Sequence, residues 1–169
     1  MDLIHIAIVE DEPLFVQQLK EYIGRYEKDR GRRIKITTFA DGEDITDDYC
    51  GGYDIILMDI QMRFMDGMTA AEKIRTLDHE VIIMFITNMI QYAVRGYEVD
   101  AMDYVVKPVE YFAFSQKLDK AIGRMKKAVQ TYISVPTEDG LQKLAVSDIY
   151  YIESQGHNAC YRTARGEFL

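Results

Sequence analysis

Stretches of consecutive apolar residues recur along the first two thirds of the chain, and polar residues separate them. The four clearest are Leu3–Val9, Tyr53–Met58, Val81–Ile86 and Ala101–Val106. Because these runs are nearly continuous rather than alternating, they indicate strands that are buried on both faces, as in a parallel sheet. A weaker run rich in β-branched residues, Arg33–Phe39, predicts a fifth strand.

Between these runs, apolar residues recur at the spacing of a helix. One set follows Pro13, a second follows Asp66-Gly67, and a third is a long amphipathic stretch. Their members are Leu14, Leu19, Tyr22, Ile23 and Tyr26; Met68, Ala71, Ile74 and Leu77; and Phe112, Leu118, Ala121, Ile122, Met125 and Val129. A further helix is expected over about Gln91–Tyr97. Strands that alternate with helices predict one doubly wound α/β domain over residues 1–128.

The pattern changes after residue 128. Residues 129–169 hold short strand-like runs separated by turn signals, and they lack a helical periodicity. The runs are 133–135, 141–146, 149–152 and 159–163. A few hairpins of this size are too small to enclose a large core. We therefore interpret residues 129–169 as the incomplete N-terminal part of a second, all-β domain.

The charge balance narrows the classes of partner. The chain has 20 Lys and Arg against 28 Asp and Glu, a net charge of −8, which is unsuited to non-specific contact with nucleic-acid phosphates. The cysteines, Cys50 and Cys160, provide neither a disulfide framework nor the spacing of metal ligands. Every apolar run is far shorter than a membrane span, and the N-terminus lacks a targeting pattern. We expect a soluble cytoplasmic protein without a membrane partner.

Acidic residues, a threonine or a lysine follow four of the five predicted strands. Glu10-Asp11 ends the first strand, Asp59 the third, Thr87 the fourth and Lys107 the fifth. The carboxyl ends of parallel strands meet at one edge of the sheet, so these side chains are expected to share a pocket. Carboxylates packed together repel one another unless a cation lies among them. Carboxylate oxygens and water are the ligands that Mg²⁺ prefers, so the sequence predicts a magnesium site at this edge.

The same residues supply the parts needed for an aspartyl phosphate. Asp59 follows a buried strand, and a carboxylate in that position can attack a phosphoryl group. Lys107 offers a point charge for one phosphoryl oxygen, and the Thr87 hydroxyl can donate to another. The predicted catalytic residues are therefore Asp59 as phosphoacceptor, Lys107 and Thr87.

Four motifs resemble the receiver domain of bacterial two-component response regulators. They are Ile8–Pro13, Ile56–Met62, Phe85–Asn88 and Ala101–Pro108, which occur in the order and spacing of that family and span about three quarters of the chain. The resemblance implies a flavodoxin-like fold with a five-stranded parallel sheet. It also implies that a sensor histidine kinase phosphorylates Asp59 and that the protein is a regulator rather than an enzyme.

Several residue roles follow from this resemblance alone. It implies that Mg²⁺ is held by Glu10, Asp11, Asp59 and the backbone carbonyl of Gln61. It implies that Thr87 and Tyr104 switch together, and that the Lys107–Pro108 peptide bond is cis. It further implies that the phosphorylated protein forms a homodimer through the face built from the helix near 91–97, the fifth strand and the fifth helix.

The C-terminal stretch is similar to the opening of a LytTR-type DNA-binding domain. The similarity rests on Asp148–Ser154 and the Gly-His-Asn loop that follows it. It implies a transcription regulator of the LytR/AlgR kind, in which His157 is a candidate DNA contact. Because the later strands and the helix of such a domain are absent, we expect DNA binding only through the complete C-terminal domain.

Three other functions use a similar fold. A magnesium-dependent phosphohydrolase needs a second carboxylate two residues after the nucleophile, where this chain has Gln61. A nucleotide or flavin binder needs a phosphate-cradling loop after the first strand, where the acidic Glu10–Glu12 lies instead. The third alternative is a receiver that acts through protein contacts without binding DNA.

Overall fold

The computed structural model of the protein describes residues 3–92, 96, 98–128, 132–137, 140–146, 149–156, 158–163 and 166–168. The chain divides into two compact units, Met1–Ile122 and Gly123–Leu169. The division falls inside helix α4 (Tyr111–Ala128), a little before the predicted boundary after residue 128.

The first unit alternates strands with helices, as its sequence pattern predicts. Its described strands are β1 (Leu3–Val9), β2 (Arg33–Phe39), β3 (Ile55–Met58), β4 (Ile82–Thr87) and β5 (Asp103–Val106). Its described helices are α1 (Pro13–Arg30), α2 (Gly42–Thr46), α3 (Gly67–Leu77), the short 3₁₀ helix η1 (Ile90–Tyr92) and α4.

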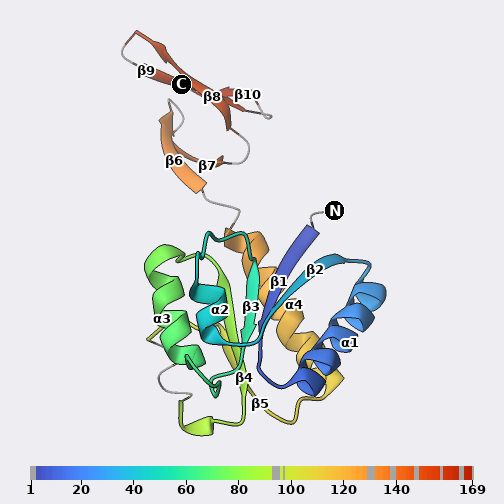
Figure 1. Ribbon diagram of the computed structural model, residues 1–169. Helices are drawn as coiled ribbons and strands as arrows, with labels where there is room; N and C mark the ends of the chain where they lie inside the picture. Colours follow the sequence, from blue (N-terminus) through green and yellow to red (C-terminus); the bar gives the residue numbers. More distant parts are fainter. Residues whose placement is uncertain are drawn as a thin grey trace. The chain divides into compact units, whose positions relative to one another are not determined.

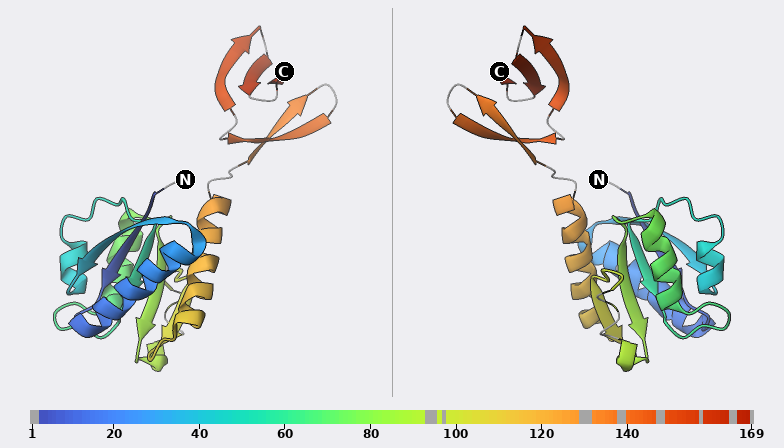
Figure 2. Two further views of the ribbon diagram at one scale, coloured as in Figure 1. Left: turned by 90° about the vertical axis from the view of Figure 1, so that its right-hand side faces the viewer. Right: turned by 90° about the vertical axis from the view of Figure 1, so that its left-hand side faces the viewer.

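The five strands form one sheet in the order β2-β1-β3-β4-β5, and every neighbouring pair is parallel. Helices α1 and α4 cover one face of the sheet, and α2 and α3 cover the other (Figure 1, Figure 2). This order is the flavodoxin-like variant of the doubly wound fold, in which ligands bind beyond the carboxyl ends of the strands. The predicted fold class is confirmed.

The central strands are buried on both faces. Every residue of β3 and β4 is buried, and β1 is buried over its last four residues. Strand β5 departs from the sequence expectation, because only Val105 of its four residues is buried. The reason is its place at the edge of the sheet, where it has a single neighbour, β4. The run Ala101–Val106, which is apolar except for Asp103, therefore identified the strand correctly but overestimated its burial.

Two helices bury most of the apolar residues that the sequence pattern assigned to the core, but each differs from it at one position near its start. Leu14 is 81% exposed, whereas the adjacent Phe15 is buried. Phe112 is 71% exposed, whereas Phe114 is fully buried. Neighbouring positions on a helix differ in direction by about 100°. Phe15 and Phe114 therefore share a face with the other buried residues of their helices, and Leu14 and Phe112 do not. Leu77, at the last turn of α3, is also exposed.

The helix expected near residues 91–97 is described only in part. Its start is the 3₁₀ helix η1, and residues 93–95 and 97 lie outside the described part of the chain. After it, Val99 is buried in the core on the face of the sheet that α2 and α3 cover. The guanidinium of Arg75, in α3, donates hydrogen bonds to the backbone carbonyls of Val99, Val81 and Asp78. The end of this connection is therefore held against α3 and β4.

Most described residues of the second unit after helix α4 lie in five strands. They are β6 (Tyr132–Thr137), β7 (Gly140–Ala145), β8 (Ile149–Gln155), β9 (Asn158–Thr163) and β10 (Gly166–Phe168). Strands β6 and β7 form a two-stranded antiparallel sheet, and β10-β9-β8 form a three-stranded one. Cys160 is buried here, while Tyr150, Tyr151 and Ile152 of β8 are exposed. The predicted all-β segment is confirmed.

Within the described ranges, every helix falls short of the length and apolar character that a membrane crossing requires.

Candidate functional site

The carboxyl ends of four neighbouring strands bring the predicted site residues to one edge of the sheet. Backbone hydrogen bonds continue the sheet pairing just beyond the strands: the Asp59 N–H donates to the Val9 carbonyl at 2.9 Å, and the Lys107 N–H donates to the Thr87 carbonyl at 3.0 Å. The backbone that carries the side chains after β1, β3 and β5 is therefore held in place by hydrogen bonds that continue the sheet.

Lys107 joins two of the predicted carboxylates. Its Nζ lies 2.8 Å from Glu10 Oε2 and 2.9 Å from Asp59 Oδ2. The three side chains are only 8%, 2% and 7% exposed, respectively. The ammonium also lies 4.2 Å from the ring centre of Phe15, which covers it from α1. Burial opposes the charge of Lys107, but the hydrogen bonds and charges of Glu10 and Asp59 outweigh it, so the pKa of Lys107 is raised and the group is a cation.

The two buried carboxylates also accept backbone hydrogen bonds. Asp59 Oδ1 accepts from the N–H groups of Ile60 at 2.6 Å and Gln61 at 3.2 Å. Glu10 Oε1 accepts from the N–H of Glu12 at 3.0 Å. Burial raises the pKa of Glu10, and the charge of Asp59 raises it further against the opposing effects of Lys107 and the Glu12 N–H. Negative charge is therefore crowded at this edge despite the bridging lysine.

These residues fit a divalent cation. Glu10, Asp11 and Asp59 each offer a carboxylate oxygen, and these oxygens all lie within 4.8 Å of one another. Asp11 is exposed while the other two are buried, so the group opens toward solvent on one side. When all three carboxylates are ionised, Lys107 leaves two negative charges uncompensated, which matches the charge and the oxygen preference of Mg²⁺. Gln61 follows in the β3–α3 loop, with its side chain exposed.

Thr87 and Tyr104 both contact the main chain of Met89, one at its N–H and the other at its carbonyl. Thr87 is fully buried at the end of β4, and its Oγ1 accepts from the Met89 N–H at 3.3 Å. The Tyr104 hydroxyl donates to the Met89 carbonyl oxygen, and its ring packs against Phe85. Burial raises the pKa of Tyr104, and the charge of Asp59 adds to this effect. The predicted switch pair is thus linked through the backbone of Met89.

The structure describes one of two further predicted features, the cis peptide bond, but not the other, the DNA contact. The Lys107–Pro108 peptide bond is cis, the geometry that the family resemblance implies. His157, the candidate DNA contact, lies outside the described residues.

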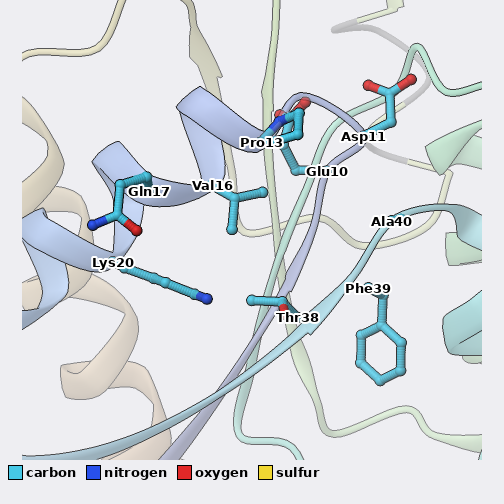
Figure 3. A pocket seen from close by; sticks show the side chains of 9 residues that line it. All are labelled: Glu10, Asp11, Pro13, Val16, Gln17, Lys20, Thr38, Phe39 and Ala40. Atoms are coloured by element: carbon cyan, nitrogen blue, oxygen red, sulfur yellow. The ribbon is translucent and has the colours of Figure 1, made fainter.

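A cleft of about 300 Å³ adjoins the acidic group between α1 and the end of β2 (Figure 3). Glu10 and Asp11 form its upper border, and Lys20 extends from α1 toward β2 across it. It is lined by Glu10, Asp11, Pro13, Val16, Gln17, Lys20, Thr38, Phe39 and Ala40. Two members of the acidic group, Glu10 and Asp11, therefore border this cleft, whereas Asp59 does not line it.

Sequence reasoning missed one buried carboxylate near this edge. Asp41, between β2 and α2, is 4% exposed and accepts hydrogen bonds from the loop after β3. Its signature is visible in the sequence as an Asp-Gly pair that follows a strand and starts a helix, which is typical of a helix N-cap. That signature predicts the cap but not the contact with the distant loop.

Comparison with known proteins agrees with this geometry. Residues 6–119, more than half of the chain, match the response regulator receiver domain family. The sensory transduction protein LytT of Enterococcus faecalis is 26% identical over 162 residues, which cover 88% of this chain and 64% of LytT. The transcriptional regulatory protein YpdB of Escherichia coli is 28% identical over 177 residues, which cover 97% of this chain and 71% of YpdB. The chain thus spans less than two thirds of the length of LytT.

Solved structures resemble the first unit. The response regulatory domain of protein mrkE from Klebsiella pneumoniae is 29% identical with a TM-score of 0.66, covering 73% of this chain and 99% of that domain. TrrA from Thermotoga maritima, solved in complex with Mg²⁺-BeF, is 27% identical with a TM-score of 0.61, covering 70% of this chain and 98% of TrrA. The chain therefore belongs to the response regulator receiver domain family, within the LytR/AlgR type of two-component response regulator.

Proposed function

We propose that Asp59 accepts a phosphoryl group from a sensor histidine kinase in a magnesium-dependent reaction, and that this modification controls transcription through the complete C-terminal domain. The observation that carries the proposal is the bridge from Lys107 to both Glu10 and Asp59, at 2.8 and 2.9 Å. A buried lysine between two carboxylates, beside a third, is a set of groups suited to receiving a phosphoryl group and its charge.

In the proposed reaction, a carboxylate oxygen of Asp59 attacks the phosphorus atom of phosphohistidine. The new P–O bond forms as the P–N bond breaks, and the imidazole leaves with the bonding electron pair. Lys107 neutralises one phosphoryl oxygen, and the Thr87 hydroxyl donates to another. Mg²⁺, when held by Glu10, Asp11, Asp59 and the Gln61 carbonyl, supplies further positive charge for the phosphoryl oxygens.

The backbone of Met89 supports a route from the site to the surface. Thr87 Oγ1 accepts from the Met89 N–H, and Tyr104 donates to the Met89 carbonyl. If the Thr87 hydroxyl turns to a phosphoryl oxygen on Asp59, its contact with Met89 changes, and the environment of Tyr104 changes with it. Phosphorylation thereby biases two arrangements of the β4–β5 region, and the homodimer is the proposed outcome.

Phosphorylation is tested by intact-mass measurement after incubation with a small phosphodonor and Mg²⁺. We expect one added phosphoryl group on the wild type and none on Asp59→Asn. The matched control is Asp54→Asn, because Asp54 lies at the other end of the same strand, where its Oδ2 accepts from the His5 N–H at 2.8 Å. Labelling of Asp59→Asn at the wild-type level would refute the assignment of the phosphoacceptor.

The transcriptional role is supported by the similarity to YpdB, which covers 97% of this chain and so includes the β-rich unit. The test is chromatin immunoprecipitation of the protein expressed from its own gene. We expect enrichment at a small set of promoters that depends on Asp59. A receiver that acts only through protein contacts gives no enriched promoters, and that result would contradict this part of the proposal.

A further inference from the structure

A buried carboxylate outside the acidic site connects two loops of the first unit. Asp41 lies between β2 and α2, and it is 4% exposed. Buried carboxylates require specific partners, because an unpaired one carries a large desolvation cost. The partners of Asp41 are backbone N–H groups from two separate segments, and they indicate what this residue does.

The first partner belongs to the helix that Asp41 begins. Asp41 Oδ1 accepts from the Glu43 N–H at 3.0 Å, the usual contact of an N-cap residue. The other partners lie more than twenty residues further along the chain. Oδ2 accepts from the Phe64 N–H at 2.9 Å, and Oδ1 also accepts from the Met65 N–H at 2.9 Å. A single side chain thus caps α2 and holds the loop between β3 and α3.

Close packing of two glycines fixes the same loop. A Cβ atom on Gly42 would lie 2.6 Å from the Met65 carbonyl oxygen, so residue 42 must be glycine for Asp41 to approach the loop this closely. At the loop's far end, a Cβ on Gly67 would lie 2.0 Å from the Asp59 carbonyl oxygen, and the Gly67 N–H donates to the Ile60 carbonyl at 2.9 Å. The loop is therefore held at its closing end by Gly67 and in its middle by Asp41.

This loop carries part of the proposed metal site. It begins directly after Asp59, and Gln61 is its second residue. Its first residue, Ile60, is buried in the core. Side-chain burial contributes less to the rest of the loop, because Gln61 and Phe64 are exposed and Met62 and Met65 are only partly buried. Hydrogen bonds to Asp41 are thus a main constraint on the backbone that follows the phosphoacceptor.

We propose that Asp41 is a positioning residue for the metal site: by fixing the backbone at Phe64 and Met65, it shapes the Asp59–Gly67 loop and so increases the affinity of the acidic group for Mg²⁺. Asp41 does not itself belong to the acidic group formed by Glu10, Asp11 and Asp59. The inference rests on the proposed function, because it assumes that Mg²⁺ binds at this group with the help of the Gln61 carbonyl.

The ionisation of Asp41 agrees with this role. Burial opposes its charge, but the backbone N–H groups of Glu43, Phe64, Met65 and Arg63 together lower its pKa below the ordinary value. The side chain is therefore a carboxylate at neutral pH, and charged acceptors form stronger hydrogen bonds than neutral ones.

Two substitutions separate the cap of α2 from the contact with the loop. Asp41→Ser keeps a good N-cap side chain but is too short to reach the loop amides. Asp41→Asn keeps an oxygen for Glu43 and Met65 but presents an NH₂ group to the Phe64 N–H. The matched control is Asp78→Asn, because Asp78 Oδ1 also accepts two backbone N–H groups, from Glu80 and Val81 at 3.0 Å, but does so at the end of α3.

Mg²⁺ affinity of the full chain is measured by isothermal titration calorimetry, and amide exchange of the loop is followed by NMR. We expect Asp41→Ser to bind Mg²⁺ about tenfold more weakly than the wild type. Asp41→Asn should lie between them. The exchange of the Phe64 amide should accelerate in both variants, and that of the Met65 amide in Asp41→Ser. Asp78→Asn should lose stability but bind Mg²⁺ like the wild type.

The outcomes distinguish this inference from the proposed function. If the wild type binds no Mg²⁺, the proposed metal site is wrong and the inference fails with it. If the wild type binds Mg²⁺ and both Asp41 variants bind it equally well, the inference alone is wrong. It also fails if Asp78→Asn weakens binding as much as Asp41→Ser, because the effect then reflects only lost stability.

Discussion

Replacing Lys107 by methionine removes the charge that bridges Glu10 and Asp59 but keeps an unbranched side chain of similar length. The three side chains are at most 8% exposed, so water cannot readily replace the lost ammonium. Removing one partner from a buried ion pair typically costs about 3–5 kcal/mol, because the remaining charge is left uncompensated. Without Mg²⁺, we expect Lys107→Met to lower the free energy of unfolding by about that amount.

Magnesium should reverse part of this loss. Lys107 contacts oxygens of two residues that also form the candidate metal site, so the lysine and Mg²⁺ compete for them. Binding at about 100 times Kd adds about 2.7 kcal/mol to stability, and a tenfold tighter site adds about 1.4 kcal/mol more. We therefore expect Mg²⁺ to stabilise Lys107→Met more than the wild type.

The assay is urea unfolding followed by circular dichroism, in EDTA and in excess Mg²⁺. Lys20→Met is the control, because Lys20 is exposed on α1 and a surface change of this kind stays within about 0.5 kcal/mol. The reasoning is refuted if Lys107→Met is as stable as the wild type in EDTA. It is also refuted if Mg²⁺ stabilises both proteins by the same amount.

Two further predictions concern stability. Phe114→Ala should lower the free energy of unfolding by about 3–5 kcal/mol, because Phe114 is fully buried. Phe112→Ala should lower it by less than about 0.5 kcal/mol, because Phe112 is 71% exposed. Equal losses for the two variants in urea unfolding would contradict the assigned helix face. Burial opposes the charge of Asp103, but Lys117 at 2.5 Å, the Tyr104 N–H and Lys120 together lower its pKa. The stabilisation by Asp103 is therefore complete above the ordinary aspartate pKa of about 3.9 and is lost as the pH falls through the lower folded-state value. The stability difference between the wild type and Asp103→Asn should shrink over that acid range, and a difference that stays constant to about pH 2 would contradict this assignment.

The sheet could be predicted because a strand that is buried on both faces has apolar residues at nearly every position. Strands β3 and β4 are buried at every position, and both appear in the sequence as unbroken apolar runs. Strand β5 lies at the edge, where one neighbour is missing, and it begins with the charged Asp103. Asp103 is a local sign of weaker burial, but strand order is a property of the whole sheet and cannot be read from a local pattern.

Helix faces were predicted less well than strands. The apolar pattern after Pro13 included Leu14, but the buried ring is Phe15, which covers Lys107 at 4.2 Å. Both residues are apolar, so hydrophobicity alone cannot choose between them. Helical spacing can, because Phe15 lies on the same face as the buried Leu19 and Ile23, and Leu14 does not.

One part of the candidate site could be predicted from the sequence and another could not. The proximity of residues at strand ends was predictable, because parallel strands end at one edge of the sheet. The contacts of Lys107 with Glu10 and Asp59 agree with that expectation. The contact of Asp41 with the β3–α3 loop could not be found in this way. Its partners are backbone amides, which every residue except proline possesses, so the sequence carries no sign of which amides are used.

The link through Met89 uses only main-chain atoms of that residue: its N–H for Thr87 and its carbonyl for Tyr104. Any amino acid other than proline can provide both groups, so a different side chain at position 89 leaves the donor and the acceptor of this link in place. The Met89 side chain itself packs against the core, so the constraint on residue 89 is one of size and shape rather than of hydrogen bonding.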